Sequence, residues 1–401
     1  MTSRLTHAPS LMETYPPPPV TFVSGSGTLL VDTDGKHYLD FLSGLAVTSL
    51  GHAHPHVAQA VEHQANRLVH VSNLFGNELS PPLARTIDRL VGDGQPAGGR
   101  VFFGNSGAEA NECAIKLARR YFSRSAREGE IARHVVVSAY GSFHGRTLAT
   151  LHATGQSEKH VGFAPMPEGF AHVDFGDLAA LEDATTGPVV AAVLIEVIQG
   201  EGGVVPAPPG YLKAVRDLCD ERGMLLIVDE IQTGLGRTGR WFAFQRTDIK
   251  PDIVTIAKAL GNGFPIGACW ARAEVAAAFQ PGDHGSTFGG QPLACAAAIA
   301  TLEALEDLDA PQAAAHAGAR LADGLAAIDG VSHVRGEGLL LGVVLEPGID
   351  AKAVVRTALE RGLVVNAPVP GVIRLAPPLN VSDAEIDEAV AILRQILEEP
   401  A

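Results

Sequence analysis

The chain has 401 residues, of which 46% are hydrophobic and 5% aromatic, and its net charge is −15, from 45 acidic and 30 basic residues. This composition is typical of a soluble globular protein with about two or three domains, and the negative charge argues against nucleic acid or an anionic membrane as the main partner. No run of about 18 apolar residues predicts a membrane span, and no long apolar segment near the N-terminus indicates a signal peptide.

The first residues of the chain are expected to form a loose arm over 1–20, because Pro16 to Pro19 favour extended polyproline geometry. Residues 27–39 alternate in polarity and turn at Asp34-Gly35, a pattern typical of a β-hairpin. The four cysteines that follow along the chain show no C-x-x-C spacing and indicate reduced thiols in a cytoplasmic protein. They are Cys113, Cys219, Cys269 and Cys295.

From about residue 55 onward, helical segments alternate with short apolar runs. This alternation predicts an α/β fold with a mostly parallel sheet covered by helices. The expected strands are 100–103, 135–138, 190–196, 225–229, 253–257 and 266–271, and the expected helices include 108–122 and 210–222. A long Ala-rich helix over 292–307 is followed by a smaller α+β section, with strands near 339–345 and 372–375. A last helix is expected from Ser382, where Ser382 and Glu385 form a capping box.

The segment 105–111 follows an expected strand and opens a helix. Gly107 lets the backbone come close to a ligand, and the free N–H groups and dipole of the first turn favour an anion such as phosphate. A plain strand-to-helix turn with a serine cap is the alternative. In the next such loop, Phe143 and Arg146 suit ring stacking and capture of a carboxylate, although a surface loop would also explain them.

Asp229 ends an apolar strand, so its carboxylate is expected to meet a buried cation, and Gln232 nearby can donate to an oxygen. Residues 234–239 match the dinucleotide pattern G-x-G-x-x-G, but residues 230–233 separate them from the strand and no clear helix follows. A nucleotide-dependent dehydrogenase is therefore an alternative that rests on these glycines alone. His52, His54 and His56 have no accompanying carboxylate or cysteine ligands, and we expect no metal site.

Lys258 ends the apolar run 253–257 and precedes the turn-rich stretch 261–265. Desolvating an ammonium costs several kcal/mol or depresses its pKa. A lysine in that setting is a nucleophilic amine that reacts with carbonyls. A side chain extending to the surface would explain the same segment if it stood alone.

These features together describe a site for pyridoxal 5′-phosphate. Lys258 would hold the aldehyde and, once freed, move a proton, while Asp229 would pair with the pyridine nitrogen. Phe143 would stack on one face of the ring and Ile231 would pack against the other.

Seven motifs over nearly the whole chain, from Tyr15 to Leu397, resemble those of the class III, fold-type I aminotransferases. They are 105–111, 143–147, 196–203, 229–239, 258–267, 284–290 and 373–377. The resemblance implies a large cofactor-binding domain over 56–290. It also implies a small domain built from an N-terminal arm and hairpin, 1–55, and from a linking helix and C-terminal section, 291–401.

The resemblance also assigns the cofactor contacts. Ser106, Gly107 and Ala108 bind the phosphate, and Asp229 and Gln232 hold the pyridine nitrogen and the ring hydroxyl. The partner subunit of a homodimer supplies two further residues, Thr287 to the phosphate and Ser286 to the substrate.

Substrate handling follows from the same resemblance. Arg146 takes the substrate carboxylate, and Arg374 takes the α-carboxylate of glutamate or 2-oxoglutarate. Glu201 pairs with Arg374 while the ω-amine donor is bound and swings away for the oxo acid.

The activity implied is transfer of the ω-amino group of N2-acetyl-L-ornithine to 2-oxoglutarate in arginine biosynthesis. Leu45 and Gly76 stand where ornithine aminotransferases typically carry tyrosines, which favours the acylated substrate. Ornithine, succinyl-diaminopimelate, 4-aminobutyrate and carrier-bound lysine remain alternatives, as does a regulatory protein that kept the fold and lost catalysis. Val197, Asn262 and Gln291 depart from the family's usual proline, glycine and asparagine, and none of the three removes a reacting group.

Overall fold

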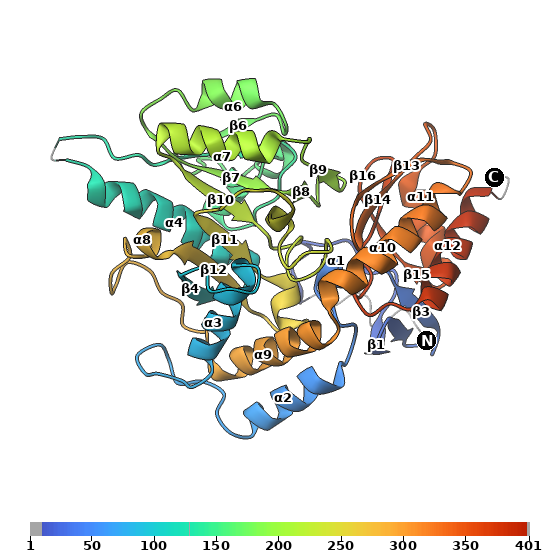
Figure 1. Ribbon diagram of the computed structural model, residues 1–401. Coiled ribbons are helices and arrows are strands. Elements are labelled where there is room, and N and C mark those ends of the chain that lie inside the picture. Colours follow the sequence, from blue (N-terminus) through green and yellow to red (C-terminus); the bar gives the residue numbers. More distant parts are fainter. Residues whose placement is uncertain (1–9, 128, 399–401) are drawn as a thin grey trace.

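The largest element of the fold is a seven-stranded sheet from the middle of the chain, seen in a computed structural model that describes residues 10–127 and 129–398 (Figure 1). Residues 1–9 of the expected N-terminal arm lie outside these ranges. The strand order is β4-β12-β11-β10-β7-β5-β6. The strands are β4 (Gly99–Gly104), β5 (Val135–Ala139), β6 (Phe170–Val173), β7 (Val190–Glu196), β10 (Leu225–Asp229), β11 (Ile253–Ile256) and β12 (Gly267–Arg272).

The prediction of a mostly parallel sheet is confirmed. Neighbouring strands from β6 to β11 run parallel, and β12 alone runs antiparallel to its two neighbours, β11 and β4. Every residue of β7 and β10 is buried, as expected for central strands covered on both faces. The sequence missed the edge strand β6 and the reversed direction of β12.

Each face of this sheet packs against its own set of helices. Helix α4 (Gly107–Ser125) covers one face, where Leu117 lies in the same apolar cluster as Ile227 of β10. Helix α7 (Tyr211–Arg222) covers the other face, where Val215 clusters with Val228. The other helices of this part are α2 (Pro55–Ala65), α3 (Ser80–Val91), α5 (Leu148–Ala153), α6 (Leu178–Ala184) and α8 (Ala273–Ala276).

The two ends of the chain build a second, smaller α+β part, on the right in Figure 1. One of its sheets has the order β1-β2-β3-β15, so the C-terminal strand β15 (Leu363–Val364) pairs in parallel with β3 (His37–Asp40). The predicted hairpin is confirmed as β2 (Leu29–Asp32) and β3. Strand β1 (Phe22–Ser26) completes this sheet.

The other sheet of the smaller part has the order β13-β14-β17-β16 and is packed by the last three helices. Its elements are α10 (Ala310–Ala326), β13 (Val331–Glu337), β14 (Leu340–Leu345), α11 (Ala351–Glu360), β16 (Asn366–Val369), β17 (Val372–Leu375) and α12 (Asp383–Glu398). The capping box before α12 is confirmed, since the Ser382 amide donates to Glu385 Oε2 at 2.8 Å and the Glu385 amide donates to Ser382 Oγ at 3.3 Å. Helix α9 (Pro292–Asp307) links the two parts. The boundaries at 55/56 and 290/291 stay predictions.

The glycine-rich stretch 234–239 is a connecting loop, and the next helical segment is only the short 3-10 turn η3 (Ala243–Arg246). Arg237 in this loop is 1% exposed and donates to the Leu339 carbonyl at 3.1 Å and to Ser49 Oγ at 3.0 Å. The loop therefore ties the large sheet to both ends of the chain, and it lacks the strand-turn-helix geometry of a dinucleotide site.

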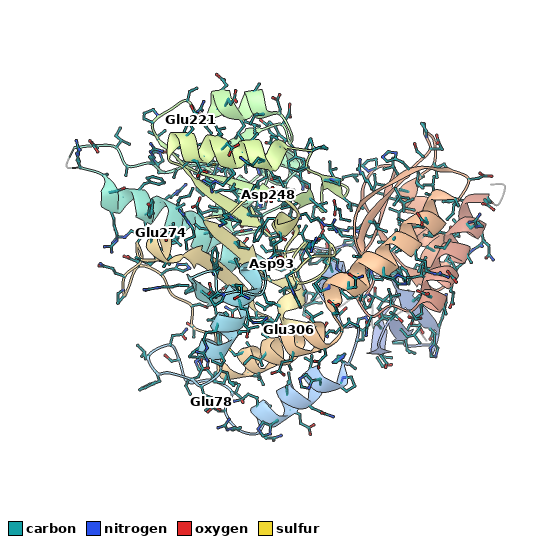
Figure 2. The ribbon with its side chains drawn as sticks, viewed as in Figure 1. Glu78, Asp93, Glu221, Asp248, Glu274 and Glu306 are labelled. Carbon is teal, nitrogen blue, oxygen red and sulfur yellow. The ribbon has the colours of Figure 1, made fainter. Side chains whose placement is uncertain are left out.

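The acidic excess of the chain lies on its surface. Figure 2 labels six acidic side chains on outer helices and loops, all of them exposed: Glu78, Asp93, Glu221, Asp248, Glu274 and Glu306. Within the described ranges, no helix is long and apolar enough to cross a membrane.

Candidate active site

A cavity of about 380 Å³ opens at the carboxyl ends of the central strands. This is the edge where ligands bind in sheets of this kind. It is lined by Val47, residues 105–108, residues 143–146, Glu196, Glu201, Asp229, Ile231, Gln232, Ala257, Lys258 and residues 263–266. Most of the predicted site residues thus lie in one place, although they come from segments far apart in the chain.

Lys258 directly follows β11 and Ala257, and begins the 3-10 turn η4 (Lys258–Gly261). Its backbone φ of 42° lies in the left-handed region, which a residue other than glycine rarely adopts and which often marks a functional position. Burial lowers the pKa of its amine to about 8, while the charges of Glu201 and Arg374 act in opposite directions. The amine is therefore a nucleophile near neutral pH, and a side chain merely extending to the surface does not describe it.

Asp229, at the end of β10, is 4% exposed. Its Oδ2 accepts a hydrogen bond from Asn111 Nδ2 at 2.8 Å, and its Oδ1 accepts one from the Ile231 amide at 3.0 Å. Within residues 10–127 and 129–398 no lysine or arginine pairs with it. A buried carboxylate that faces a cavity and is paired with no lysine or arginine suits a ligand that brings its own positive charge.

Two buried side chains around Asp229 were missed by sequence reasoning. His144 Nδ1 lies 2.8 Å from Asp229 Oδ2, and Asn111 Nδ2 bridges Asp229 to the His144 carbonyl, also at 2.8 Å. Asn111 stands four residues after Gly107 on α4, on the same helix face, and this spacing was the available signal.

Glu196 is a further carboxyl group that the sequence left without a role. It ends β7 directly beside Asp229 on β10, since the two are paired in the strand register. Burial, and then the charge of Asp229, raise the pKa of the Glu196 carboxyl well above its usual range. The Phe143 amide donates to its Oε2 at 3.2 Å, so Glu196 also fixes the loop that carries the aromatic ring.

The start of α4 has the geometry of an N-capped helix end, and binding of an anion there stays a prediction. Ser106 is the N-cap residue and accepts a hydrogen bond from the Glu109 amide at 3.2 Å. The N–H groups of Gly107 and Ala108, in the first turn, have no acceptor inside the helix. A Cβ added to Gly107 would lie 2.8 Å from Ile231 Cδ1, so glycine is what allows the helix to approach Ile231.

Phe143 and Arg146 face the same cavity. The guanidinium carbon of Arg146 lies 5.5 Å from the centroid of the Phe143 ring. Arg146 is exposed, and no carboxylate among the described residues pairs with it. It is therefore available to an anionic substrate.

Arg374 on β17 is 1% exposed and forms an ion pair with Glu201, in which Nη1 lies 2.6 Å from Oε1. The same Nη1 donates to Gln232 Oε1 at 3.2 Å, and Nε donates to Asn366 Oδ1 at 3.1 Å. Burial would raise the pKa of the Glu201 carboxyl, but the charge and hydrogen bond of Arg374 lower it. Arg374 Nη2 is buried and has no partner among the described residues, so the guanidinium retains donor capacity for an incoming carboxylate.

Ser286 and Thr287 do not line this cavity. Ser286 Oγ accepts hydrogen bonds from Asn105 Nδ2 at 3.1 Å and from the Gly289 amide at 3.0 Å, and Thr287 is exposed. Their roles across a subunit interface stay predictions.

The donor set fits pyridoxal 5′-phosphate. The helix start can hold the phosphate, the buried Asp229 can hold the ring nitrogen, and Phe143 and Ile231 both line the space a ring would fill. Lys258 supplies the amine that reacts with an aldehyde.

Comparisons with known proteins identify the family of this chain. The chain matches the family described as aminotransferase class-III over residues 12–397. It is 46% identical to the acetylornithine aminotransferase of Methanothermobacter thermautotrophicus, covering 96% of each chain, and 47% identical to that of Caldanaerobacter subterraneus, covering 97% of each.

Solved structures give the same result. The ornithine aminotransferase of Toxoplasma gondii superposes with a TM-score of 0.91 at 36% identity, covering 97% of this chain and 92% of that one. The N-acetylornithine aminotransferase of Stenotrophomonas maltophilia gives a TM-score of 0.82 at 38% identity, covering 95% and 96%. By sequence and fold, the chain belongs to the class III aminotransferase family.

Proposed function

We propose that this protein transfers the ω-amino group of N2-acetyl-L-ornithine to 2-oxoglutarate, giving N-acetyl-L-glutamate 5-semialdehyde and L-glutamate, as a step of arginine biosynthesis. The observation that carries the proposal is the ion pair between Glu201 and Arg374 beside the cavity of Lys258. An aminotransferase of this kind must accept an amine far from a carboxylate in one half-reaction and an amine beside a carboxylate in the other. Full-length relatives named acetylornithine aminotransferase support the choice of donor.

Class III aminotransferases depend on pyridoxal 5′-phosphate, which when bound accepts the amino group and delocalises the electrons released at the substrate carbon. Ser106, Gly107 and Ala108 would hold its phosphate. Asp229 would keep the ring nitrogen protonated, because its buried carboxylate favours a positive charge there, and Gln232 would contact the ring hydroxyl.

Lys258 has two tasks in this proposal. Its Nζ would hold the cofactor covalently in the absence of substrate, and as a free amine it would accept the proton of the substrate carbon. A pKa of about 8 suits both, since the neutral amine is available near neutral pH.

Arg146, Glu201 and Arg374 select the substrate. With the acetylated donor, Arg146 binds the carboxylate, and Glu201 remains paired with Arg374 so that this second cation attracts no anion. With glutamate or 2-oxoglutarate, Glu201 moves away and the α-carboxylate takes its place on Arg374.

A homodimer is part of the proposal, with Thr287 reaching the phosphate and Ser286 the substrate of the partner subunit. It is supported by large apolar side chains that are exposed near these residues and on the loop before α3. Leu74 is 87% exposed, Phe75 71% and Phe288 65%. The four free, buried cysteines suit a reducing compartment, and we propose the cytoplasm.

Ornithine is the second candidate donor, because solved ornithine aminotransferases share the fold closely. Neither Leu45 nor Gly76, where such enzymes typically carry tyrosines, lines the cavity of this chain. The other ω-amines named above would be tested alongside.

The deciding experiment compares kcat/KM for acetylornithine, ornithine, succinyl-diaminopimelate and 4-aminobutyrate, with 2-oxoglutarate as acceptor. We expect acetylornithine to be preferred at least about tenfold, and equal or better turnover of a non-acylated amine would overturn the assignment. Lys258→Ala is the control for background transfer. Formation of 2-oxoglutarate from glutamate in a single turnover separates an enzyme from a protein that kept the fold and lost catalysis.

A further inference from the structure

Asn262 occupies a backbone position that usually belongs to glycine. It follows the turn η4 that begins at Lys258, and its φ of 45° and ψ of 43° place it in the left-handed region. Asparagine tolerates this conformation better than most residues, and glycine adopts it freely. The backbone therefore needs no side chain here, and the reason for an asparagine must lie in its contacts.

The side-chain amide of Asn262 bridges two successive residues near the N-terminus. Its Oδ1 accepts a hydrogen bond from the Leu50 amide at 2.8 Å, and its Nδ2 donates to the Gly51 carbonyl at 3.1 Å. Leu50 is 2% exposed, so its N–H has little access to water as an alternative partner. Both polar ends of the asparagine are thus used on one short stretch of backbone.

That stretch ends a segment that forms part of the cavity wall. Val47, four residues before Gly51, lines the cavity. Just before it, Ser43, Leu45 and Ala46 all have positive φ values, from 50° to 72°. Such strained backbone persists only where the surroundings hold it, so the wall depends on its anchors.

The anchors of this segment come from different parts of the fold. Arg237 donates to Ser49 Oγ at 3.0 Å, the Leu379 amide donates to the Ser49 carbonyl at 2.7 Å, and Asn380 Nδ2 donates to the Leu50 carbonyl at 3.1 Å. These three contacts fix the segment to the C-terminal part and to the glycine-rich loop. The two hydrogen bonds of Asn262 differ from these three contacts, because they fix the segment to the turn that carries Lys258.

Lys258 and Asn262 bracket that turn, and both have left-handed backbones, with φ values of 42° and 45°. A tie at Asn262 therefore holds the far end of a turn whose near end presents the reacting amine. Loosening the tie would let the wall at Val47 move relative to Lys258 Nζ.

We propose that Asn262 is a positioning residue that sets the distance between the cavity wall at Val47 and the amine of Lys258. It helps to hold an amino-acid substrate at the correct position relative to Lys258 Nζ, and it takes no part in proton transfer. The inference rests on the proposed function only in that Lys258 is the reacting amine.

The matched variant is Asn262→Gly, which keeps the left-handed backbone accessible and removes only the two side-chain hydrogen bonds. Two measurements are made: hydrogen exchange of the Leu50 amide, and single-turnover kinetics with glutamate, whose use does not depend on which ω-amine is the natural donor. We expect exchange at Leu50 to rise about tenfold, the apparent Kd for glutamate to rise about fivefold, and the rate at saturation to stay within about twofold.

Two further variants sharpen the test. Asn262→Asp still accepts the Leu50 N–H but cannot donate to the Gly51 carbonyl, so its Leu50 exchange should stay closer to that of the wild type. Asn66→Gly is the control variant: it removes one side-chain hydrogen bond, to the Glu62 carbonyl, at the end of α2 and far along the chain from Lys258. Glutamate affinity should not change in this variant.

Three results would overturn the inference: unchanged Leu50 exchange in Asn262→Gly, faster exchange with unchanged glutamate affinity, or a loss confined to the rate at saturation. If wild-type protein fails to convert glutamate, the proposed function fails instead, and the exchange measurement still reports whether the tie exists.

Discussion

His144 Nδ1 lies 2.8 Å from Asp229 Oδ2, and both side chains are buried at the end of the central sheet. Together with Asn111, His144 fixes the direction in which the Asp229 carboxylate points.

Replacing His144 should therefore weaken cofactor binding through Asp229. A lost hydrogen bond to a carboxylate costs about 1.5–3 kcal/mol, so we expect His144→Leu to raise the Kd for pyridoxal 5′-phosphate about tenfold to a hundredfold. His144→Asn can still place a donor near the Nδ1 position and should recover part of the loss. Equilibrium dialysis measures both, and equal Kd values for Leu, Asn and wild type would contradict this role.

Glu201→Gln keeps the shape of the side chain and removes its charge, leaving Arg374 as an unneutralised cation. We expect the KM for glutamate to fall and the KM for the ω-amine donor to rise about tenfold, since the free guanidinium attracts the wrong carboxylate. The two half-reactions are measured separately. Glu303→Gln, an exposed carboxylate on α9 that pairs with His56, is the matched control and should leave both KM values unchanged. If both KM values rise in Glu201→Gln, Glu201 does not move on and off Arg374 between the two half-reactions.

The low pKa of Lys258 predicts a distinct pH dependence of chemical modification in the cofactor-free protein. Below pH 8 only a minor fraction of the amine is neutral and reactive, and above pH 8 most of it is the neutral nucleophile. The rate of acetylation at Lys258 should therefore rise with pH and reach half its maximum at about pH 8, as read by mass spectrometry. Lys213, a surface lysine paired with Asp217, is the internal comparison. A midpoint for Lys258 near pH 10.5 would show that burial does not act on this amine.

Gly107→Ala tests the anion seat. The added methyl group would lie 2.8 Å from Ile231 Cδ1 and must displace that side chain, which packs where the ring is expected. We expect the Kd for pyridoxal 5′-phosphate to rise at least about tenfold with little change in thermal stability. Gly187→Ala serves as the control because a Cβ there meets nothing within 4 Å. An unchanged Kd for pyridoxal 5′-phosphate in Gly107→Ala would show that the cofactor ring does not bind beside Ile231.

Much of the large part of the fold could be predicted because its central strands are short apolar runs bounded by turn residues. The position of Lys258 could be predicted for the same reason, since a charged residue at the end of such a run stands out. Strand β6 was missed because it is a short, half-buried edge strand with weak alternation. The direction of β12 was missed although the connection 257–266 is short for a parallel crossover.

The contacts around Asp229 could not be predicted, because they depend on which strands become neighbours. Glu196 and Asp229 are 33 positions apart and meet only through the register of β7 and β10. His144 and Asn111 likewise reach Asp229 from two other segments. For Arg237, the glycine pattern drew attention to a nucleotide site, whereas the buried guanidinium serves to join the two parts of the molecule.

Leu39 of β3 pairs with Leu363 of β15, so β3, which is synthesised early, cannot complete its pairing until β15 has been synthesised near the end of the chain. Until the ribosome has released residue 364, the edge of β3 is open to other chains, and Ser49 and Leu50 lack their contacts from residues 379 and 380. The wall at Val47 can settle only after that. A functional catalyst thus requires almost the entire polypeptide, because the segment that carries Val47 is held by residues near both ends of the chain.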